Sequence, residues 1–358
     1  MGKHYDELIR LSREVSDYSS IGAVLSWDQE TYLPPRGARA RGRHLGQLSA
    51  LAHRLATAPE VGAAIRGAEG EKLEGAAAVN LREIRRSYER QTRIPTELVR
   101  ELTETSVAAR QAWKEARAKD EFPIFAPFLE KLVALRRRYA EAIGFDGEPY
   151  DALLDGYEQG MTAAEVSRIF DGLRPRLVAL AAKIRGARPL RTDFLHRSFP
   201  APGQARLGRR VLELMGFDFQ AGRFDVSAHP FCTSFSPDDV RLTVRYDESF
   251  FNAAFFGLMH EGGHGLYEQG LPSAHEGTPA GEAVSLGIHE SQSRLWENQV
   301  GRSRAFWRHF FPFVREEFPD ALRDVTEEEM WRAVNEAKPS LIRVEADEVY
   351  YNLHIMLR

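Results

Sequence analysis

Apolar residues recur at helical spacing through the first half of the chain, up to about residue 185. One such stripe runs through Leu81, Ile84 and Tyr88, and comparable stripes follow it. A period of about 3.6 residues places these side chains on one face of a helix, and that face must be buried against a partner. A chain of 358 residues can bury a large core. The pattern predicts a mainly α-helical protein with a helical N-terminal part over about residues 1–185.

Turn-forming residues separate the stripes. Leu33-Pro34-Pro35, Ile94-Pro95-Thr96 and Asp155-Gly156 each interrupt a helical pattern, because proline cannot continue a helix and glycine favours turns. Thr162 and Glu165 have the spacing of a capping box, which predicts a further helix after Thr162.

Neither repeats nor linkers divide the sequence. It contains no internal repeat, no low-complexity segment and no evident interdomain linker. We therefore expect a single domain over residues 1–358, in which the motif-bearing part spans about 186–358.

Composition and charge exclude several classes of partner. The net charge is -4 and the pI is about 6.3, so no global field attracts nucleic acid. No stretch approaches the roughly 20 apolar residues of a membrane span, and the N-terminus lacks the apolar run of a secretory signal. Cys232 is the single cysteine, which suits a reducing compartment. We expect a cytoplasmic protein that binds neither nucleic acid nor membranes.

A short stretch departs from the helical pattern. From Val240 to Tyr246 apolar and polar residues alternate, which predicts a half-buried strand. The β-prone residues His229 to Phe235 precede it and could pair with it across the turn at Ser236-Pro237-Asp238. We expect a small antiparallel sheet here, and a strand to which a peptide substrate could add.

A metal-binding pattern follows this strand. His260 and His264 lie four residues apart, which on a helix places both imidazoles on one side. Two neutral imidazoles so placed can bind one zinc ion, with Glu261 close enough to reach a metal-bound water. Chance matches to His-Glu-x-x-His do occur in long chains, and a plain helix surface is the alternative. Gly262 and Gly263 are costly inside a helix, by about 1 kcal/mol each relative to alanine. Their presence predicts a close backbone approach.

A catalytic zinc ion needs a third protein ligand. The segment from Gly281 to Gln292 offers Glu282, His289 and Glu290, and spacing alone leaves the choice open. Near the end of the sequence, Arg343 could grip a substrate carboxylate through two hydrogen bonds. An ion pair with a neighbouring acidic residue would explain that arginine equally well.

Five short motifs follow one another in the second half of the chain. They are His229-Pro230-Phe231, Asp239-Val240-Arg241-Leu242-Thr243, His260-Glu261-Gly262-Gly263-His264, His289-Glu290-Ser291-Gln292 and Ile342-Arg343-Val344-Glu345-Ala346-Asp347-Glu348. In this order they resemble the carboxypeptidase Taq family of metallocarboxypeptidases. The early stretches Leu25–Pro35 and Tyr150–Asp155 resemble that family too, so the likeness spans nearly the whole chain.

The resemblance implies a fold and a metal site. The fold is a helical, saddle-like metallopeptidase with a deep groove and a small sheet beside the zinc ion, commonly as a homodimer. Glu290 then completes the site with His260 and His264, and Glu261 is the general base. The metal is zinc, with cobalt as a possible substitute.

The resemblance also implies which residues bind the substrate. It further implies that the sequence ends before the C-terminus of a typical family member. Arg241 and Arg343 correspond to arginines associated with substrate recognition, and His229 and Tyr351 are further candidates. Tyr350 departs from the family pattern, in which we expect threonine. Family members continue past the Asn352–Arg358 stretch, so the C-terminal helices that form one groove wall are expected to be missing here.

Together these features predict a metallocarboxypeptidase that hydrolyses the C-terminal bond of peptides with broad specificity, using a zinc-bound water as nucleophile. Two alternatives remain at this point. One is a zinc oligopeptidase that cuts internally, because such enzymes share the metal signature. The other is a truncated metal-binding protein with little or no catalysis.

Overall fold

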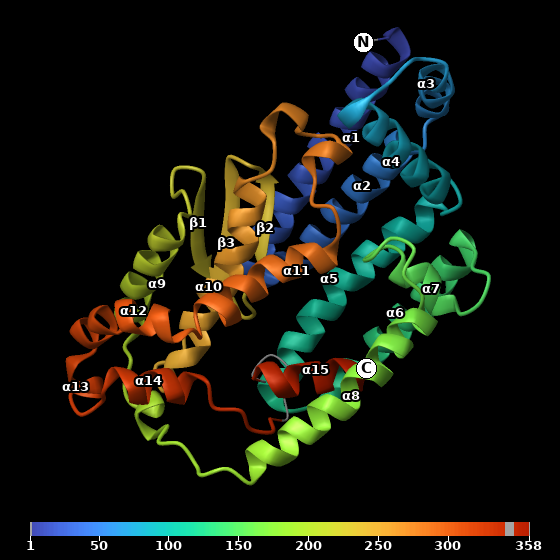
Figure 1. Cartoon of the computed structure of the whole chain (residues 1–358). Helices are drawn as coiled ribbons and strands as arrows, with labels where there is room; N and C mark the ends of the chain where they lie inside the picture. The colour runs from blue at the N-terminus through green and yellow to red at the C-terminus, as the bar shows by residue number, and fades with distance from the viewer. Residues whose placement is uncertain (1, 341–346, 358) are drawn as a thin grey trace. The chain divides into compact units, whose positions relative to one another are not determined.

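The computed structural model describes residues 2–340 and 347–357, which form mainly α-helices together with three short strands (Figure 1). The chain divides into two compact units, both made of discontinuous segments. The first unit contains the residues up to Gly160, Thr233–Asp239 and Gly270–Ser285. The second contains Met161–Cys232, Val240–Gln269 and the described residues from Leu286 onward.

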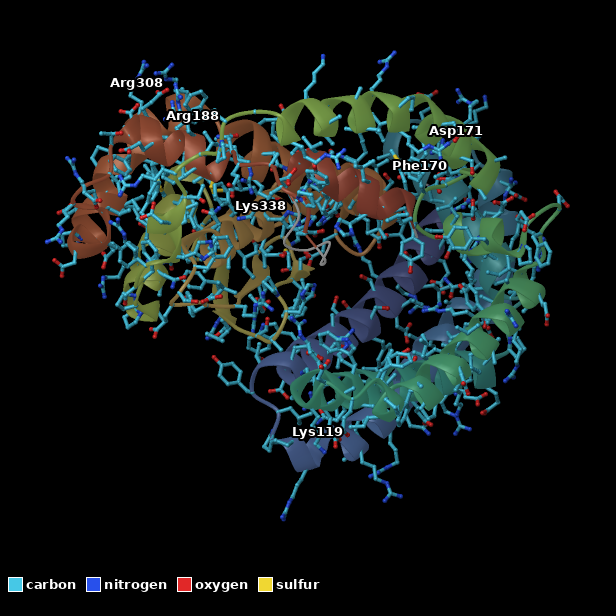
Figure 2. All side chains as sticks on the ribbon, turned by 90° about the horizontal axis from the view of Figure 1, so that it is seen from below. Lys119, Phe170, Asp171, Arg188, Arg308 and Lys338 are labelled. Atoms are coloured by element: carbon cyan, nitrogen blue, oxygen red, sulfur yellow. The ribbon has the colours of Figure 1, made fainter. Side chains whose placement is uncertain are left out.

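The first unit is a set of helices connected by short turns. They are α1 (Lys3–Thr31), α2 (Ala38–Ala56), α3 (Pro59–Glu69), α4 (Gly75–Gln91), α5 (Thr96–Lys119), α6 (Ala126–Ile143) and α7 (Pro149–Leu154). The predicted breaks are confirmed, since α1 ends before Pro34, α5 begins directly after Pro95, and α7 ends before Asp155. At the end of α5 the ammonium of Lys119, which is labelled in Figure 2, lies 2.7 Å from the Glu115 carboxylate one turn earlier. A cation at a helix C-terminus is stabilised by the helix dipole.

Two clusters form the core of this unit. The predicted stripes supply both, because α1, α3 and α4 share one cluster and α5, α6 and α7 share the other. Tyr5 and Leu8 of α1 pack against Val61 and Ile65 of α3. Leu98 and Leu102 of α5 pack in the second cluster. The stripe residues Leu81, Ile84 and Tyr88 are half-buried against the first cluster.

The second unit contains the remaining helices. They are α8 (Ala163–Arg185), α9 (Ala201–Met215), α10 (Phe251–Gln269), α11 (Leu286–Arg294), α12 (Arg304–Glu317), α13 (Pro319–Leu322), α14 (Glu327–Val334) and α15 (Glu348–Met356). A π-helical segment, Leu295–Val300, continues α11. The capping box predicted at Thr162 and Glu165 is present at the start of α8.

The strands form one mixed sheet. They are β1 (Gly222–Val226), β2 (Cys232–Ser236) and β3 (Asp239–Val244), in the order β1-β3-β2. The predicted pairing of the second and third strands is present, but β1 runs parallel to β3, with Gly222 opposite Val240. The expectation of a purely antiparallel sheet is therefore wrong, because β1 was not recognised in the sequence.

The central position of β3 alters two expectations. Thr243 is one of the polar residues of the alternating pattern, yet it is fully buried. Its hydroxyl accepts hydrogen bonds from the Phe231 N–H at 2.9 Å and from the Ser227 hydroxyl at 2.8 Å, which satisfies the buried group. With β1 on one side and β2 on the other, β3 has no open edge, so a peptide cannot add beside it.

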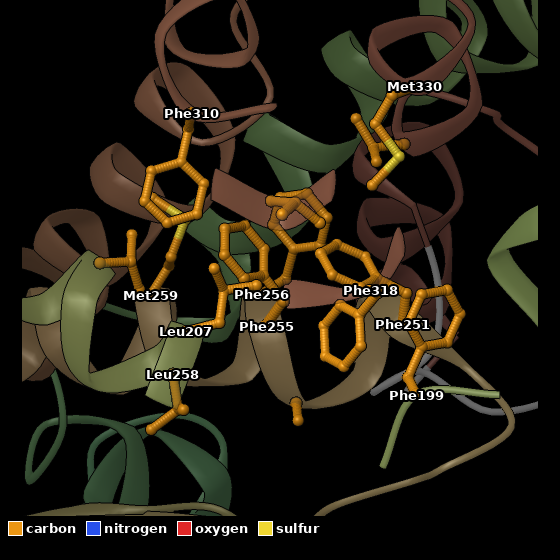
Figure 3. Close-up of a cluster of buried hydrophobic side chains, with 14 of the residues drawn as sticks. Phe199, Leu207, Phe251, Phe255, Phe256, Leu258, Met259, Phe310, Phe318 and Met330 are labelled. Carbon is orange, nitrogen blue, oxygen red and sulfur yellow. The ribbon is translucent and has the colours of Figure 1, made fainter. Parts of the chain in front are cut away.

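Aromatic side chains fill the core of the second unit. Phe251, Phe255 and Phe256 project from α10 into this core, beside Phe310 of α12 and Phe318 (Figure 3). The rings of Phe251 and Phe255 stack at 5.1 Å, and that of Phe255 lies 5.5 Å from Phe310. Burial of this size anchors one face of α10 firmly and leaves its other face for chemistry.

Among the described residues, no helix combines the length and the apolar content that a membrane crossing requires.

Candidate metal centre

Helix α10 carries the two histidines of the metal pattern. Its apolar face, which includes Phe251, Phe255 and Leu258, is buried in the core as the sequence predicted. His260 and His264 lie one turn apart on the same helix and are only partly buried, with imidazole side chains 22% and 14% exposed. The aromatic core thus fixes α10, and the helical period brings both imidazoles to one place.

Helix α11 brings a carboxylate to these histidines. One donor atom each from His260, His264 and Glu290 lies within 4.8 Å of the others. Glu290 Oε2 is 3.5 Å from His260 Nε2 and 3.3 Å from His264 Nε2. The Ser293 hydroxyl donates to the Glu290 backbone carbonyl at 2.7 Å and lies 3.2 Å from its carboxylate. Of the three residues that spacing left open as the third ligand, the structure brings Glu290 into this group.

The two glycines between the histidines explain how closely the helices pack. A β-carbon on Gly263 would lie 2.6 Å from the Gln292 carbonyl oxygen and 2.7 Å from Ser293 Cα. A β-carbon on Gly262 would lie 2.4 Å from a methyl group of Leu212 on α9. A β-carbon at either position would force a neighbour to move. The predicted close backbone approach is confirmed at Gly263, where the neighbour is the backbone of α11, whereas at Gly262 the neighbours are side chains of α9.

Glu261, between His260 and Gly262 on α10, lies in the interior of the second unit. Its side chain is almost completely buried, with the residue 6% exposed. Burial raises the pKa of the Glu261 carboxyl to about 7, and the nearby carboxylates of Glu290 and Glu297 add to this while His260 opposes it. A carboxyl group in this range can both take up and release a proton near neutral pH.

A second carboxylate contacts the ring nitrogen of His260 that faces away from Glu290. Glu297, on the π-helical segment, accepts a hydrogen bond from His260 Nδ1 at 2.9 Å. Its carboxylate is 15% exposed and lies 3.3 Å from Arg294 and 3.6 Å from Arg302. Burial acts to lower the pKa of His260, but the carboxylates of Glu297, Glu261 and Glu290 together outweigh it and hold that pKa above its ordinary value. Burial also lowers the pKa of Arg302.

His289 lies behind the other histidine. Its Nδ1 is 2.5 Å from His264 Nδ1, and its Nε2 is 2.7 Å from Glu268 Oε1. Burial lowers the pKa of His264, so its imidazole is neutral, which is the form that ligates a metal ion. Burial acts to raise the pKa of Glu290, but His264 and His260 outweigh it, so that this carboxyl is ionised.

The other residues proposed from the sequence occupy varied positions. Arg241 lies on β3 and is half-buried, and His229 lies in the loop between β1 and β2, where its carbonyl accepts from Ser227 at 2.7 Å. Tyr351 of α15 has its ring under the Arg294 guanidinium at 4.1 Å. Arg343 lies outside the described residues. Glu282 belongs to the first unit and is not part of the donor group.

Sequence reasoning missed two carboxylates that contact the histidines or their neighbours. Glu268 follows His264 by one helical turn on α10, a spacing that places both on the same face. That spacing was a usable signal. Glu297 lies two turns beyond Glu290, on the same side of the α11 segment, but its role depends on how α11 packs on α10 and has no local signature.

Comparison with known proteins agrees with this geometry. The family described as carboxypeptidase Taq (M32) metallopeptidase has a model that matches residues 7–358. Thermostable carboxypeptidase 1 of Thermus thermophilus is 47% identical over 369 residues, covering 99% of this chain and 72% of the relative. Carboxypeptidase 1 of Bacillus subtilis is 36% identical, covering 98% of this chain and 71% of the relative.

Solved structures give the same picture. A crystal structure of BsuCP superposes with a TM-score of 0.97 at 35% identity, covering 99% of this chain and 72% of that one. The M32 carboxypeptidase from Deinococcus radiodurans R1 has a TM-score of 0.91 at 42% identity, with the same coverage. Metallocarboxypeptidase 1 of Trypanosoma cruzi has a TM-score of 0.86 at 38% identity, again over 99% of this chain and 72% of that one.

Proposed function

Because this chain belongs to the carboxypeptidase Taq (M32) family of metallopeptidases and is a metallocarboxypeptidase, we propose that it works with a zinc ion held by His260, His264 and Glu290. The observation that carries this proposal is the convergence of three donor atoms from α10 and α11 within 4.8 Å. Peptides are its substrates, and single residues leave from their C-termini with broad specificity.

The donor set fits zinc. Two imidazole nitrogens and one carboxylate oxygen form a usual catalytic set and leave an open position. Cobalt accepts the same donors. When bound, the ion polarises the scissile carbonyl and lowers the pKa of the attacking water. His264 is neutral and Glu290 is ionised before any metal arrives, so these two need no proton release to ligate.

Glu261 is the proposed general base. It lies next to His260 on α10 and is buried, so its carboxylate is shielded from bulk water. It takes a proton from the attacking water and passes it to the leaving amine. A pKa raised to about 7 by burial suits both transfers. The charge of a cation in the site lowers this pKa and favours the base form at the start of the reaction.

Recognition of the substrate's free carboxylate is assigned to arginine. A guanidinium can make two parallel hydrogen bonds to a carboxylate. Arg343 and Arg241 are the proposed residues, and Arg241 extends from β3 within the unit that holds the donor group. His229 precedes β2 and is proposed to contact the peptide. Tyr351 is proposed to contact the substrate while its ring stacks under Arg294.

We also propose a homodimer in the cytoplasm. The single cysteine suits a reducing compartment, and the family resemblance supports the dimer. Light scattering across a range of concentrations tests the dimer, and a monomer at every concentration would reject it.

Mass spectrometry of digested peptides tests the proposed function. A ladder of single-residue losses from the C-terminus, abolished by a chelator and restored by zinc, is the expected result. A C-terminally amidated peptide should resist, because it lacks the free carboxylate. Cleavage inside the amidated peptide would favour an oligopeptidase, and zinc binding without cleavage would favour a noncatalytic metal-binding protein. Elemental analysis of the purified protein identifies the metal.

A further inference from the structure

A histidine and a glutamate outside the proposed ligand set extend behind His264. His264 Nδ1 lies 2.5 Å from His289 Nδ1, and His289 Nε2 lies 2.7 Å from Glu268 Oε1. We propose that His289 and Glu268 form a positioning relay, in which Glu268 acts through His289 to hold His264 as a metal ligand through Nε2. The inference rests on the proposed metal centre and deepens it.

The hydrogen positions in this relay follow from the contacts. His264 Nε2 faces Glu290 Oε2 at 3.3 Å, so Nε2 is the nitrogen that a shared metal ion would bind, and in the metal-bound state the hydrogen of the ring is on Nδ1. That N–H donates to Nδ1 of His289, which must be unprotonated to accept it. His289 then carries its hydrogen on Nε2 and donates it to the Glu268 carboxylate.

The opposite direction of the hydrogen bond between His264 and His289 is unfavourable. If His289 donated through Nδ1 to His264, its Nε2 lone pair would face the Glu268 carboxylate, and two acceptors would repel each other. A doubly protonated His289 would place its Nδ1 hydrogen against the Nδ1 hydrogen of His264. With a metal ion between His264 Nε2 and Glu290 Oε2, one arrangement satisfies all the contacts, and it is the arrangement in which His264 offers Nε2 to that ion.

The surroundings hold the relay in place. Helix α10 supplies both ends, since His264 and Glu268 lie one turn apart, and α11 inserts His289 between them. The side chains of His264, His289 and Glu268 are 14%, 16% and 17% exposed, so their hydrogen bonds are largely shielded from water. The His289 ring lies 4.5 Å from that of His264, and the Tyr267 ring packs against it edge-on at 5.4 Å.

The relay also positions the third ligand. His289 directly precedes Glu290 on α11, so a contact that fixes His289 against α10 fixes the start of α11 beside the two histidines. His260, by contrast, receives its support from the Glu297 carboxylate in a single hydrogen bond. A negative charge at the far end of either arrangement makes the ligand imidazole more basic and strengthens its bond to a metal ion.

Zinc affinity measured by chelator competition on the full chain tests the relay. We expect His289→Ala and Glu268→Ala each to weaken zinc binding by about tenfold or more, as for other supports of ligand histidines. Glu268→Gln keeps an oxygen that can accept from His289 but loses the charge, so its loss should be smaller. Glu213→Gln removes a half-exposed carboxylate on α9 that pairs with Arg209, and it serves as the matched control with unchanged affinity.

The double variant separates a relay from a local structural role. If Glu268 acts through His289, then Glu268→Ala costs no further affinity when His289 is already alanine. Equal losses from Glu268→Ala in both backgrounds would overturn the relay, and so would wild-type affinity in Glu268→Ala. Nitrogen NMR of the imidazoles in the zinc-loaded protein gives a second readout: His289 should carry its hydrogen on Nε2, and hydrogen on Nδ1 would reject the assignment.

One further variant distinguishes this inference from the proposed function. His264→Ala removes a proposed ligand directly and should abolish tight zinc binding. If His264→Ala loses zinc while Glu268→Ala keeps it, the relay fails and the metal centre stands. If His264→Ala binds zinc as tightly as the wild type, the proposed metal centre itself fails.

Discussion

Gly263 of α10 and Ser293 of α11 approach each other so closely that a β-carbon on the glycine would lie 2.7 Å from Ser293 Cα. Two helix backbones can meet in this way only where one of them has no side chain. The contact lies one residue from His264 and three residues from Glu290, so it sets the distance between the ligands that the two helices supply.

The first prediction concerns this contact. Gly263→Ala should push α11 away from α10, weaken zinc binding at least tenfold, and destabilise the protein by about 1–3 kcal/mol through overpacking. Gly257 is the matched control, because it lies on the same helix and a β-carbon there meets nothing within 4 Å. Gly257→Ala should be neutral or stabilising by up to about 1 kcal/mol. Chelator competition and denaturant unfolding measure both effects, and equal behaviour of the two variants would contradict the prediction.

The second prediction concerns the general base. Glu261→Gln should retain its metal, because Glu261 is not in the donor group, and should lose turnover by about 10²–10⁴-fold. Metal content and steady-state hydrolysis of an unblocked peptide are the two measurements. Undiminished hydrolysis by a metal-loaded variant would remove Glu261 from its proposed role.

The third prediction concerns Glu297 and the charges around it. Replacing this carboxylate by leucine removes the hydrogen bond to His260 and leaves Arg302 largely buried without its partner at 3.6 Å. We expect zinc affinity to fall about 10–100-fold. The free energy of unfolding should fall by about 3–5 kcal/mol, the usual effect of breaking a buried ion pair.

A double variant tests whether the loss of stability comes from the Arg302 charge that is left without its carboxylate. Glu297→Leu with Arg302→Met removes both charges, so stability should recover in part while zinc affinity remains low. Unfolding in denaturant and chelator competition are again suitable. If stability fails to recover, the loss does not come from the unpaired arginine.

The fourth prediction is a dependence of stability on pH. His53 of α2 is buried, with Nε2 3.0 Å from the Gln91 carbonyl and Nδ1 3.0 Å from the Thr96 hydroxyl. Burial lowers the pKa of His53, and Arg54 adds to this while the Gln91 carbonyl opposes it. The unfolded chain therefore binds this proton more readily than the folded one. The contribution of His53 to stability is fully present above the unfolded pKa of about 6.5, and it is lost as the pH falls through the folded pKa.

Denaturant unfolding between neutral and mildly acidic pH tests this. The wild type should lose stability as the pH decreases below about 6.5, and His53→Gln should lose less. His44→Gln removes an exposed histidine from the same helix and should follow the wild type. Parallel curves for wild type and His53→Gln would show that another group causes the acid loss.

The fifth prediction concerns metal removal. At a free zinc concentration about 100-fold above Kd, binding should stabilise the protein by about 2.7 kcal/mol. A chelator should therefore lower the melting temperature of the wild type. His264→Ala should melt at the same temperature with and without chelator, and a chelator effect of wild-type size in that variant would place the metal elsewhere.

Most of the fold could be predicted from the sequence, because the signals of a helix lie within a few neighbouring turns of the chain. The stripe through Leu81, Ile84 and Tyr88 and the capping box at Thr162 are satisfied within one helix or its immediate neighbour. Strand β1 could not be predicted, because its five residues begin with glycine and are too few to show an alternation of apolar and polar side chains. The third strand was predicted to end at Tyr246 but ends at Val244, and its burial on both faces could not be inferred without β1.

The site residues likewise fall into those that local sequence predicts and those that depend on packing between helices. His260 and His264 were evident, because one helix sets their spacing. Glu290 could not be chosen over Glu282 and His289 by spacing, because the choice depends on how α11 packs against Gly263. The support of His260 by Glu297 is a contact between separate elements, which no local pattern encodes. The cost of glycine in a helix was the one sequence signal that pointed to this packing.

The interleaving of the two units constrains how the protein can be made. Between Gln269 and Leu286 the chain leaves the second unit for the first and then returns, so His264 and Glu290 are synthesised on opposite sides of that excursion. A nascent chain cannot capture its metal ion with the full donor set until α11 has emerged from the ribosome. No single cut in the gene yields either unit intact, and attempts to express them separately must join segments that are distant in the coding sequence.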